Sequence, residues 1–237
     1  MSDASLLLLA APATVLAYAL GRRLQALWRS PLATPVFVAS ALLLALLHGT
    51  GASYPVYLAG ADPVVALLGP ATAALAIPLY KHRATLCAVL LPALSAIVSG
   101  ALATMATALV LALVLHLPGV IVASIAIKSV TAPIAAELAP LLHGDATMAV
   151  TFAVATGIAG AVAGPLLLGL ARVSSPLARG LAYGTISTGI GTSRALAESD
   201  LAGAAAAMAM SIAGVVVAVT APFVVPSVVA AFRVLTA

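Results

Sequence analysis

The chain carries very little charge for its length, and this scarcity restricts the solvent in which it can fold. Of its 237 residues, 7% are Asp, Glu, Lys or Arg and 64% are hydrophobic. The mean hydropathy is +1.24. A water-soluble domain has too little interior to hide this much apolar surface, so lipid must be the solvent for most of it. The sequence therefore predicts an all-α polytopic membrane protein with a single integral membrane domain over residues 1–237.

Apolar segments follow one another along the whole chain. They cover residues 5–20, 33–48, 63–80, 84–115, 119–142, 146–171, 178–198 and 201–231. Since a crossing takes roughly 20 residues, they predict about seven or eight membrane segments, with interrupted or re-entrant helices among them. Basic residues place the loops with Lys81 and Arg83, and with Arg172 and Arg179, on the cytoplasmic side. We expect the first segment to be a retained span with the N-terminus outside.

Two solutions fit residues 84–142, which must cross the membrane an odd number of times to satisfy these loop charges. In the first, residues 84–115 form one long tilted helix and residues 119–142 form a re-entrant hairpin. In the second, the chain breaks near Ser99–Gly100 and residues 119–142 cross as a broken helix. We favour the first.

The order of the segments also suggests an internal repeat. A short, an interrupted and a long segment begin at residues 33, 63 and 84, and again at 146, 178 and 201. The loop charges make the two copies run in opposite directions, which predicts inverted pseudo-repeats over residues 30–115 and 143–232. Inverted repeats with interrupted helices are typical of secondary transporters. The alternative is chance spacing in an Ala/Leu-rich bundle.

Two cations stand where a bilayer makes charge expensive. Lys128 lies in the run VASIAIKSVTAPIAAELAP, and Arg194 lies in GTISTGIGTSRALAESD. A cation inside a membrane segment needs a counter-charge, a water-filled cavity or a substrate. Both positions are therefore candidate functional sites.

Helix breaks accompany both cations. Pro133 disfavours helix at the residue before it and can begin a new helix, with Ser129 or Thr131 as its cap. The exposed N–H groups of such a helix start attract anions. We therefore expect an anion near this break.

The second run contains glycines at its own break. Gly189 and Gly191 predict an unwound stretch, and a new half-helix is expected to start near Thr192–Ser193. Gly69 and Pro70 predict a further break in an earlier span, either at the transport path or as a plain kink.

Together the two runs predict a pocket for a small carboxylate. Arg194 would bind it through two nitrogen atoms, and Lys128 would supply a point charge. Hydrogen bonds would come from the hydroxyl groups of Ser129, Thr131, Thr185, Ser187, Thr192 and Ser193. The alternative is that Glu137 and Glu198 neutralise the two cations, with Arg194 and Glu198 paired at i, i+4 on one helix.

The sequence shows no motif for enzymatic chemistry. It lacks the GxSxG, HExxH, P-loop and dinucleotide-binding patterns, and no His, Cys and carboxylate residues cluster as metal ligands. No run of Lys or Arg is long enough for a nucleic-acid site. We therefore expect no catalytic activity, no cofactor, no metal and no nucleic-acid partner.

In its motifs the chain resembles the LrgB/CidB family of bacterial membrane proteins, which includes the C-terminal half of the plastid glycolate/glycerate translocator. The shared elements follow the family's order from about residue 30 onward. They are Gly69–Thr72 with Pro78–Lys81, Lys128–Thr131 with Pro133, Gly157–Pro165, and Ala178–Gly180 with Gly191–Arg194. The chain departs from the family at Ala126-Ile127, where Leu-Pro is usual, at Ala132, where Thr is usual, and at Thr188, where His is usual.

The resemblance implies a carrier of small monocarboxylates, such as glycolate, glycerate, lactate or pyruvate, in the bacterial cytoplasmic (inner) membrane. The family's older label implies instead an antiholin-like regulator of murein hydrolase export and autolysis that acts through oligomerisation. In both cases the resemblance implies a separate LrgA/CidA-type membrane partner, and we expect a homo-oligomer. Thr188 in place of the family's histidine leaves proton coupling and substrate choice open.

Overall fold

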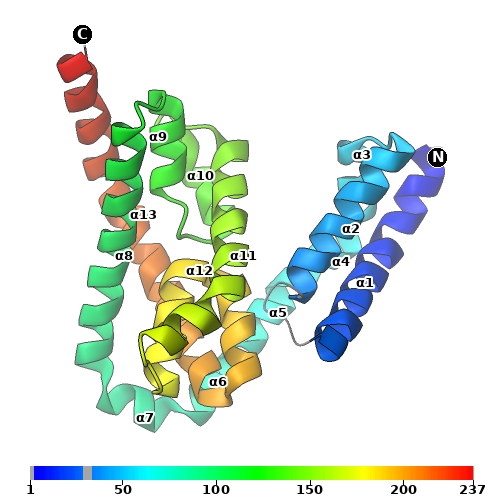
Figure 1. Ribbon diagram of the computed structural model, residues 1–237, viewed down its shortest axis with the longest axis horizontal. Helices are drawn as coiled ribbons and strands as arrows, with labels where there is room; N and C mark the ends of the chain where they lie inside the picture. The colour runs from blue at the N-terminus through cyan, green and yellow to red at the C-terminus, as the bar shows by residue number, and fades with distance from the viewer. Residues whose placement is uncertain (1–2, 29–33, 237) are drawn as a thin grey trace. The chain divides into compact units, whose positions relative to one another are not determined.

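The chain is helical throughout the part that the computed structural model describes, residues 3–28 and 34–236 (Figure 1). It forms two compact units, Met1–Ala76 and Ile77–Ala237. Five of the described helical segments are long and apolar enough to cross a membrane. They are Leu6–Leu27, Asp62–Lys81, Leu90–Val114, Ala146–Leu170 and Asp200–Ala231. The chain is therefore a polytopic membrane protein, and the other predicted segments are shorter or folded-back helices.

The first unit is built on a long N-terminal helix. Its elements are α1 (Asp3–Trp28), α2 (Pro35–Thr50), α3 (Tyr54–Gly60), α4 (Asp62–Ala66) and α5 (Leu68–Ala74). Helix α1 contacts both α2 and α3, and the hydroxyl oxygens of Thr14 and Tyr57 lie 2.8 Å apart. Because α1 continues through Arg22 and Arg23, the first helix is longer than the predicted segment 5–20.

The break predicted at Gly69–Pro70 is displaced by a few residues. Both residues lie inside the first turn of α5, and the chain leaves regular helix at Leu67 and Leu75 instead. Proline is tolerated in a first helical turn because the N–H it lacks has no partner there. A Cβ added to Gly69 would meet nothing within 4 Å, so this glycine makes no close packing contact.

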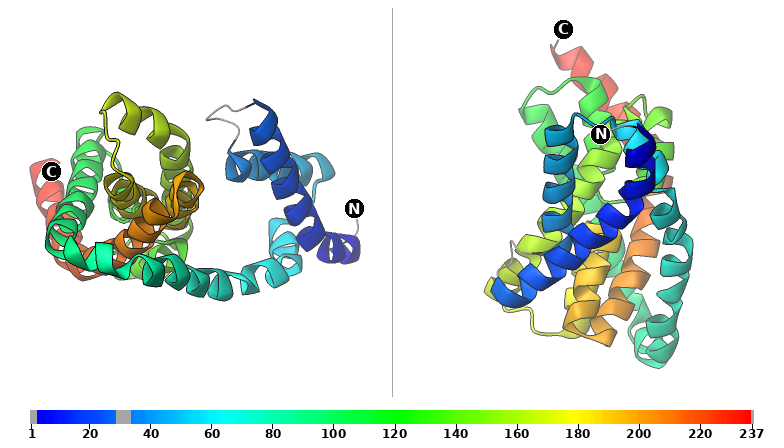
Figure 2. Two further views of the ribbon diagram at one scale, coloured as in Figure 1. Left: turned by 90° about the horizontal axis from the view of Figure 1, so that it is seen from below. Right: turned by 90° about the vertical axis from the view of Figure 1, so that its right-hand side faces the viewer.

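The second unit contains the residues singled out by their charge. Its elements are α6 (Ala76–Lys81, which begins at the unit boundary), α7 (Arg83–Ala88), α8 (Leu90–Val114), α9 (Gly119–Ala126), α10 (Ala132–Leu141), α11 (Ala146–Leu170), α12 (Pro176–Glu198) and α13 (Asp200–Thr236). Helices α8 and α13 contact each other and lie side by side in Figures 1 and 2.

Residues 119–141 form the first of two helical hairpins. Helix α8 runs unbroken through Ser99 and Gly100, whereas α9 and α10 have only 8 and 10 residues. Neither short helix could cross a bilayer alone. The two short helices are joined by residues 127–131, and the backbone N–H of Asp145, which follows α10, donates to Ser124 Oγ of α9 at 2.8 Å. The hairpin agrees with the favoured solution for residues 119–142, but residues 84–115 are not one helix as predicted, because the chain leaves regular helix at Val89 between α7 and α8.

Helix α12 forms the second hairpin because it folds back on itself at Thr188. The φ and ψ angles of Thr188 are 49° and −133°, a conformation that a β-branched residue rarely adopts and that costs of order 1–3 kcal/mol. A Cβ added to Gly191 would lie 2.6 Å from the carbonyl oxygen of Tyr183. Eight residues along a straight helix would separate these two positions by about 12 Å. The expected second half-helix thus starts at Gly189, earlier than the predicted Thr192–Ser193.

The two hairpins belong to a repeat with a short period. Helices α8 and α11 both have 25 residues and are offset by 56 at each end (146 − 90 and 170 − 114). The hairpins that follow them, residues 119–141 and 176–198, are offset by 57 at each end (176 − 119 and 198 − 141). Figure 1 shows α8 and α11 running in opposite directions. The second unit therefore contains two copies of a long helix followed by a hairpin. The two copies run in opposite directions, and α13 follows the second.

Small residues bring the second hairpin close to its neighbours. A Cβ added to Gly160 of α11 would overlap Ser187 Oγ, and one added to Gly164 would overlap the Tyr183 ring. Likewise, Gly180 and Gly184 face backbone atoms of α13. Such close approach between helices is the usual role of small residues in membrane proteins.

Candidate functional site

Lys128 lies at the tip of the first hairpin, in the loop between α9 and α10. Its ammonium group donates to Thr104 Oγ1 at 2.7 Å and approaches Ser129 Oγ at 3.5 Å. The two hydroxyl oxygens lie 3.1 Å apart. These neutral partners do not balance the positive charge, and no ion pair of the described residues includes Lys128. Lys128 therefore remains available to an anion.

The helix restart beside Lys128 follows the prediction from Pro133. Helix α10 begins at Ala132 with the proline in its first turn, and Thr131 is the N-cap residue in an extended conformation. The Thr131 side chain makes no capping hydrogen bond. Its hydroxyl group and the first N–H groups of α10 therefore lie at the same end of the hairpin as Lys128.

The tip of the second hairpin supplies further hydroxyl groups. Thr185, Ser187 and Thr188 are buried, at 4%, 2% and 8% exposed. None of their hydroxyl groups bonds to any part of the chain that the structure describes, yet none of the three oxygens is fully enclosed. A buried hydroxyl group without a partner costs about 1–3 kcal/mol. A ligand that bonds to such a hydroxyl group would recover this free energy.

The other two predicted hydroxyl residues are already bonded within the second hairpin. Thr192 Oγ1 donates to the Thr188 carbonyl oxygen at 2.9 Å. Ser193 Oγ donates to the Ile190 carbonyl oxygen at 2.8 Å and is exposed. These local bonds stabilise the start of the second arm and already occupy both hydroxyl groups.

Helix α8 places the two tips close together at its middle. Thr104 holds Lys128 and Ser129 of the first tip. A Cβ added to Gly100 would lie 3.2 Å from Thr185 Cγ2 of the second tip. Residues four apart share one face of a helix and lie about 6 Å apart along its axis. The tips are therefore neighbours near the centre of a 25-residue helix.

Helix α13 repeats this arrangement from another side. Met210 Sδ would lie 3.9 Å from a Cβ on Gly189, at the second tip. One turn later, a Cβ on Gly214 would lie 3.3 Å from Ile134 Cδ1, just after the first tip. Two long helices thus each contact both hairpins, so the candidate site is the region between the tips.

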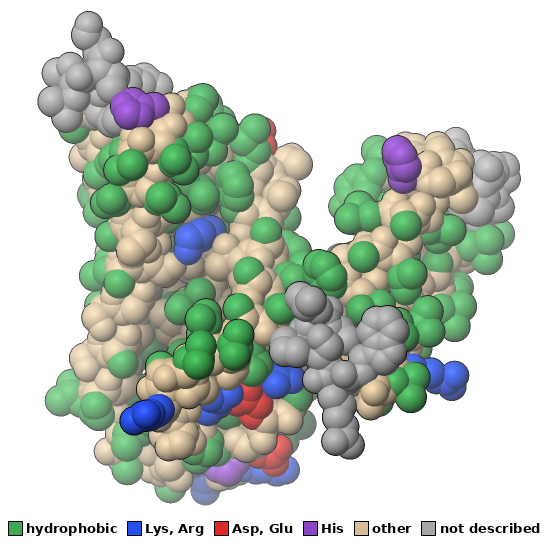
Figure 3. All heavy atoms as spheres, viewed as in Figure 1, with side chains coloured by type: hydrophobic (Ala, Val, Ile, Leu, Met, Phe, Trp, Pro, Cys, Tyr) green, Lys and Arg blue, Asp and Glu red, His purple; other side chains and the backbone are tan. Residues whose placement is uncertain are grey.

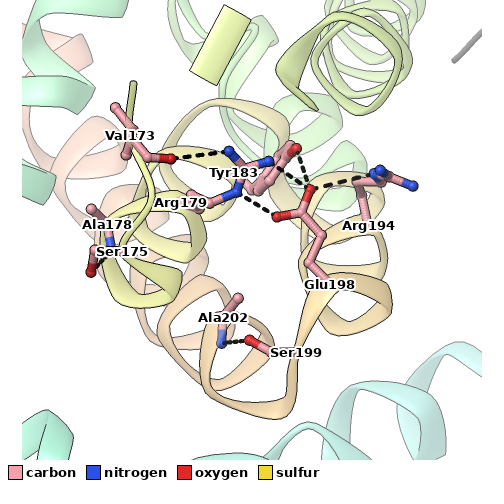
Figure 4. Close-up of polar contacts among 9 residues, drawn as sticks. All are labelled: Val173, Ser175, Ala178, Arg179, Tyr183, Arg194, Glu198, Ser199 and Ala202. Carbon is pink, nitrogen blue, oxygen red and sulfur yellow. Dashed lines mark hydrogen bonds and ion pairs between the residues drawn. The ribbon is translucent and has the colours of Figure 1, made fainter. Parts of the chain in front are cut away.

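Glu198 closes the open end of the second hairpin. The Arg179 guanidinium donates to both of its carboxylate oxygens, at 2.6 Å and 3.0 Å. The Tyr183 hydroxyl donates to Oε1 at 2.9 Å. Figure 4 shows these side chains converging from both arms of the hairpin. The network therefore joins the first arm to the second.

Arg194 belongs to this network and not to the site around Lys128. Its Nε lies 3.7 Å from Glu198 Oε1, which is the i, i+4 pair expected in the alternative interpretation. Arg194 follows Thr188 by six residues, about 9 Å along a helix. No described hydrogen bond or ion pair joins it to Lys128. The structure therefore does not bring the two cations together as predicted.

Glu137 does not pair with Lys128 either. Its side chain is exposed on α10, and the ion pairs of the described residues involve Glu198 alone among the carboxylates. Figure 3 shows most acidic and basic side chains of this unit at the end where α12 begins and ends, with basic atoms also in a hollow at mid-height beside α8. The expected neutralisation holds for Arg194 and is absent for Lys128.

We expect Glu198→Gln to destabilise the second hairpin. Loss of the carboxylate leaves Arg179 and Arg194 facing each other without a counter-charge, and hydrogen bonds to charged groups contribute about 1.5–3 kcal/mol each. The free energy of unfolding in detergent should fall by about 2 kcal/mol. Glu137→Gln is the matched control, because the same change at an exposed carboxylate should alter stability by less than about 0.5 kcal/mol. Equal stability of the two variants would contradict the role of Glu198.

Sequence reasoning missed Thr104, Arg179 and Tyr183. Thr104 lies within an apolar segment, where a lone hydroxyl usually bonds to its own helix. Arg179 and Glu198 are 19 residues apart, a spacing that brings side chains together only when the helix folds back. One signal in the sequence could have found all three: a polar residue inside or beside an apolar run needs a hydrogen-bonding partner.

The chain is similar to proteins found in several bacteria. The model of the LrgB-like family matches residues 14–227. The uncharacterized protein YxaC of Bacillus subtilis (strain 168) is 34% identical over 212 residues, covering 90% of this chain and 92% of YxaC. The uncharacterized protein YwbG of the same strain is 32% identical, covering 89% and 93%. The holin-like protein CidB of Staphylococcus aureus (strain N315) is 28% identical, covering 90% and 93%. No solved structure matches the chain.

Proposed function

The chain belongs to the LrgB-like family, and from this premise we propose that it is a carrier of small monocarboxylates that binds its substrate between the tips of its two hairpins. Like its relatives, it is a multi-pass membrane protein and not an enzyme. The observation that carries the proposal is the ammonium group of Lys128, which has hydroxyl partners at 2.7 Å and 3.5 Å but no described counter-charge.

The chemistry around Lys128 suits a carboxylate with a neighbouring oxygen. Lys128 supplies the charge, and Ser129 and Thr131 donate hydrogen bonds from the first tip. Thr185 donates from the second tip to a 2-hydroxy or 2-oxo group, whereas Ser187 Oγ faces Gly160 of α11 and takes part only if its side chain turns. Glycolate, glycerate, lactate and pyruvate share this pattern of oxygens. Arg194 and Glu198 hold the second hairpin in position in this scheme.

The repeat supports a transport cycle. Carriers with inverted repeats bind substrates at mid-membrane between interrupted helices, and the two repeats exchange roles as the site opens first to one side and then to the other. Here one hairpin enters from each end of the second unit, and both hairpins contact α8 near its middle. In our proposal, movement of one hairpin against the other exposes Lys128 to alternate sides of the bacterial cytoplasmic membrane.

Uptake by proteoliposomes tests this function. Purified protein is reconstituted with and without its LrgA/CidA-type membrane partner, and uptake of labelled pyruvate and glycolate is compared with uptake by protein-free vesicles. We expect saturable, protein-dependent uptake in at least one of the two preparations. Uptake no greater than in protein-free vesicles, in both preparations, contradicts the proposal.

A second candidate function rests on the name of one relative, the holin-like protein CidB. An antiholin-like regulator of murein hydrolase export would act through homo-oligomers and through contacts with the LrgA/CidA-type partner. In that case substitutions on exposed small-residue faces should impair function, and substitution of Lys128 should not. The same reconstituted preparations separate the two functions, because a regulator alone gives no saturable uptake.

A further inference from the structure

A groove of about 170 Å³ runs between α8 and α9 and ends at Lys128. One row of α8, Thr107, Leu111 and Leu115, lines it at intervals of one turn. Ile125 of α9 lines the opposite side. Eight residues of helix span about 12 Å, so the groove extends from the end of α8 toward its middle, where the ammonium of Lys128 bonds to Thr104.

The walls of the groove are apolar except at the lysine end. Thr107 is the one hydroxyl residue among the groove's lining residues, and its Oγ1 is bonded to the carbonyl oxygens of Ala103 and Thr104, at 2.8 Å and 3.0 Å. Alanine, leucine and isoleucine side chains form the rest, with Lys128 at one end. A ligand that fits this pattern has an anionic head and an apolar tail, because a polar tail would lose its hydrogen bonds to water without replacement.

We propose that the groove binds the aliphatic chain of a short-chain monocarboxylate whose carboxylate is held by Lys128. This rests on the proposed function and extends its substrate class beyond acids of two and three carbons. A volume of about 170 Å³ holds roughly six groups the size of a water molecule, at about 30 Å³ each. The size suits an acid of about four to six carbons, by the same volume estimate.

The proposal predicts how affinity depends on chain length. Each methylene buried in an apolar site tightens binding about fourfold, the equivalent of ~0.8 kcal/mol. Binding of acetate, propionate, butyrate, pentanoate and hexanoate is measured by displacement of labelled butyrate from purified protein in nanodiscs. The dissociation constant should fall about fourfold per carbon until the groove is full. Empty nanodiscs correct for partition of the longer acids into lipid.

Two tryptophan variants of α8 test whether the groove is responsible. Leu111 and Val110 are adjacent and equally exposed, at 59% and 60%, so a larger side chain strains the packing at neither position. Leu111 lines the groove and Val110 does not. We expect Leu111→Trp to abolish the dependence on chain length, with pentanoate binding at least tenfold weaker, and Val110→Trp to retain it.

The outcomes separate the groove from the carrier function. Equal affinity for all five acids, or an unchanged chain-length dependence in Leu111→Trp, overturns the groove proposal while uptake of pyruvate can still stand. A lipid chain that occupies the groove gives the first of these results. Tighter binding of the longer acids without uptake of any acid supports the groove and contradicts the carrier.

Discussion

Lys128→Gln is expected to weaken substrate binding by roughly 10- to 150-fold, because a charge-assisted hydrogen bond to a carboxylate contributes about 1.5–3 kcal/mol. The glutamine side chain is one atom shorter than lysine but still carries an N–H donor, and Lys128 lies in the loop between the two short helices, so the hairpin should keep its shape. The loss should therefore appear in affinity and uptake and not in thermal stability. Uptake of labelled pyruvate across a range of concentrations measures the effect.

Lys81→Gln is the matched control for this experiment. It removes the same charge from an exposed residue at the end of α6, so uptake should match that of the unaltered protein. Lys128→Arg keeps the charge but replaces a compact ammonium with a planar group, and we expect partial activity. Full uptake by Lys128→Gln with an unchanged KM would exclude Lys128 from the substrate site.

Gly184→Ala is expected to cost at least about 3 kcal/mol of stability, or to prevent folding. Its Cβ would overlap the carbonyl oxygen of Ala206 on α13 and lie 2.8 Å from the Ala206 Cα. Overpacking typically costs about 1–3 kcal/mol, and here the obstructing atoms are backbone that cannot rotate away. The effect should therefore lie at or above the upper end, and thermal unfolding in detergent measures it.

Gly169→Ala shows what the same substitution does without the overlap. Gly169 is exposed near the end of α11, and an added Cβ meets nothing within 4 Å. Alanine is favoured over glycine in helices by about 0.5–1 kcal/mol, so this variant should be as stable as the unaltered protein or slightly more so. If both variants melt alike, the close packing of α12 on α13 is not what holds the second hairpin.

The sequence predicted where along the chain the helices lie better than it predicted where they bend and fold back in space. Hydropathy alone indicated the long helices, since every backbone group in lipid needs a partner within its own segment. Pro133 correctly indicated the restart of α10. Lys128 stood out because a cation among apolar residues is rare. Each of these features depends on local sequence.

The bend at Thr188 could not be predicted because the nearby glycines have another role. Glycine is the usual residue where φ is positive, so Gly189 and Gly191 favoured a break at or after themselves. In the structure Gly191 faces the first arm of its own hairpin, and a threonine takes the positive φ of 49° instead. The close packing that this glycine allows outweighs the local backbone preference.

The structure does not show the predicted pocket in which Arg194 and Lys128 share one carboxylate, and the reason again lies in how the chain folds back. Whether two cations from segments about 60 residues apart share a ligand depends on where each guanidinium or ammonium points. The pair with Glu198 was foreseen, but Arg179 and Tyr183 also bind that carboxylate only because the helix folds back. The predicted repeats at residues 30–115 and 143–232 remain a prediction, beside the shorter period seen in the second unit.

On α8 and α13, the residues that contact the hairpins alternate between glycine and residues with larger side chains. Gly100 and Gly214 present no side chain, whereas Thr104 and Met210 present one. A hairpin that moved along these helices by one turn would lose its contact with one of the larger side chains and pass a glycine before it made the next contact. In the proposed transport cycle, the spacing of one turn between the small and the larger residues on α8 and α13 would therefore set the distance that a hairpin moves between two packed positions.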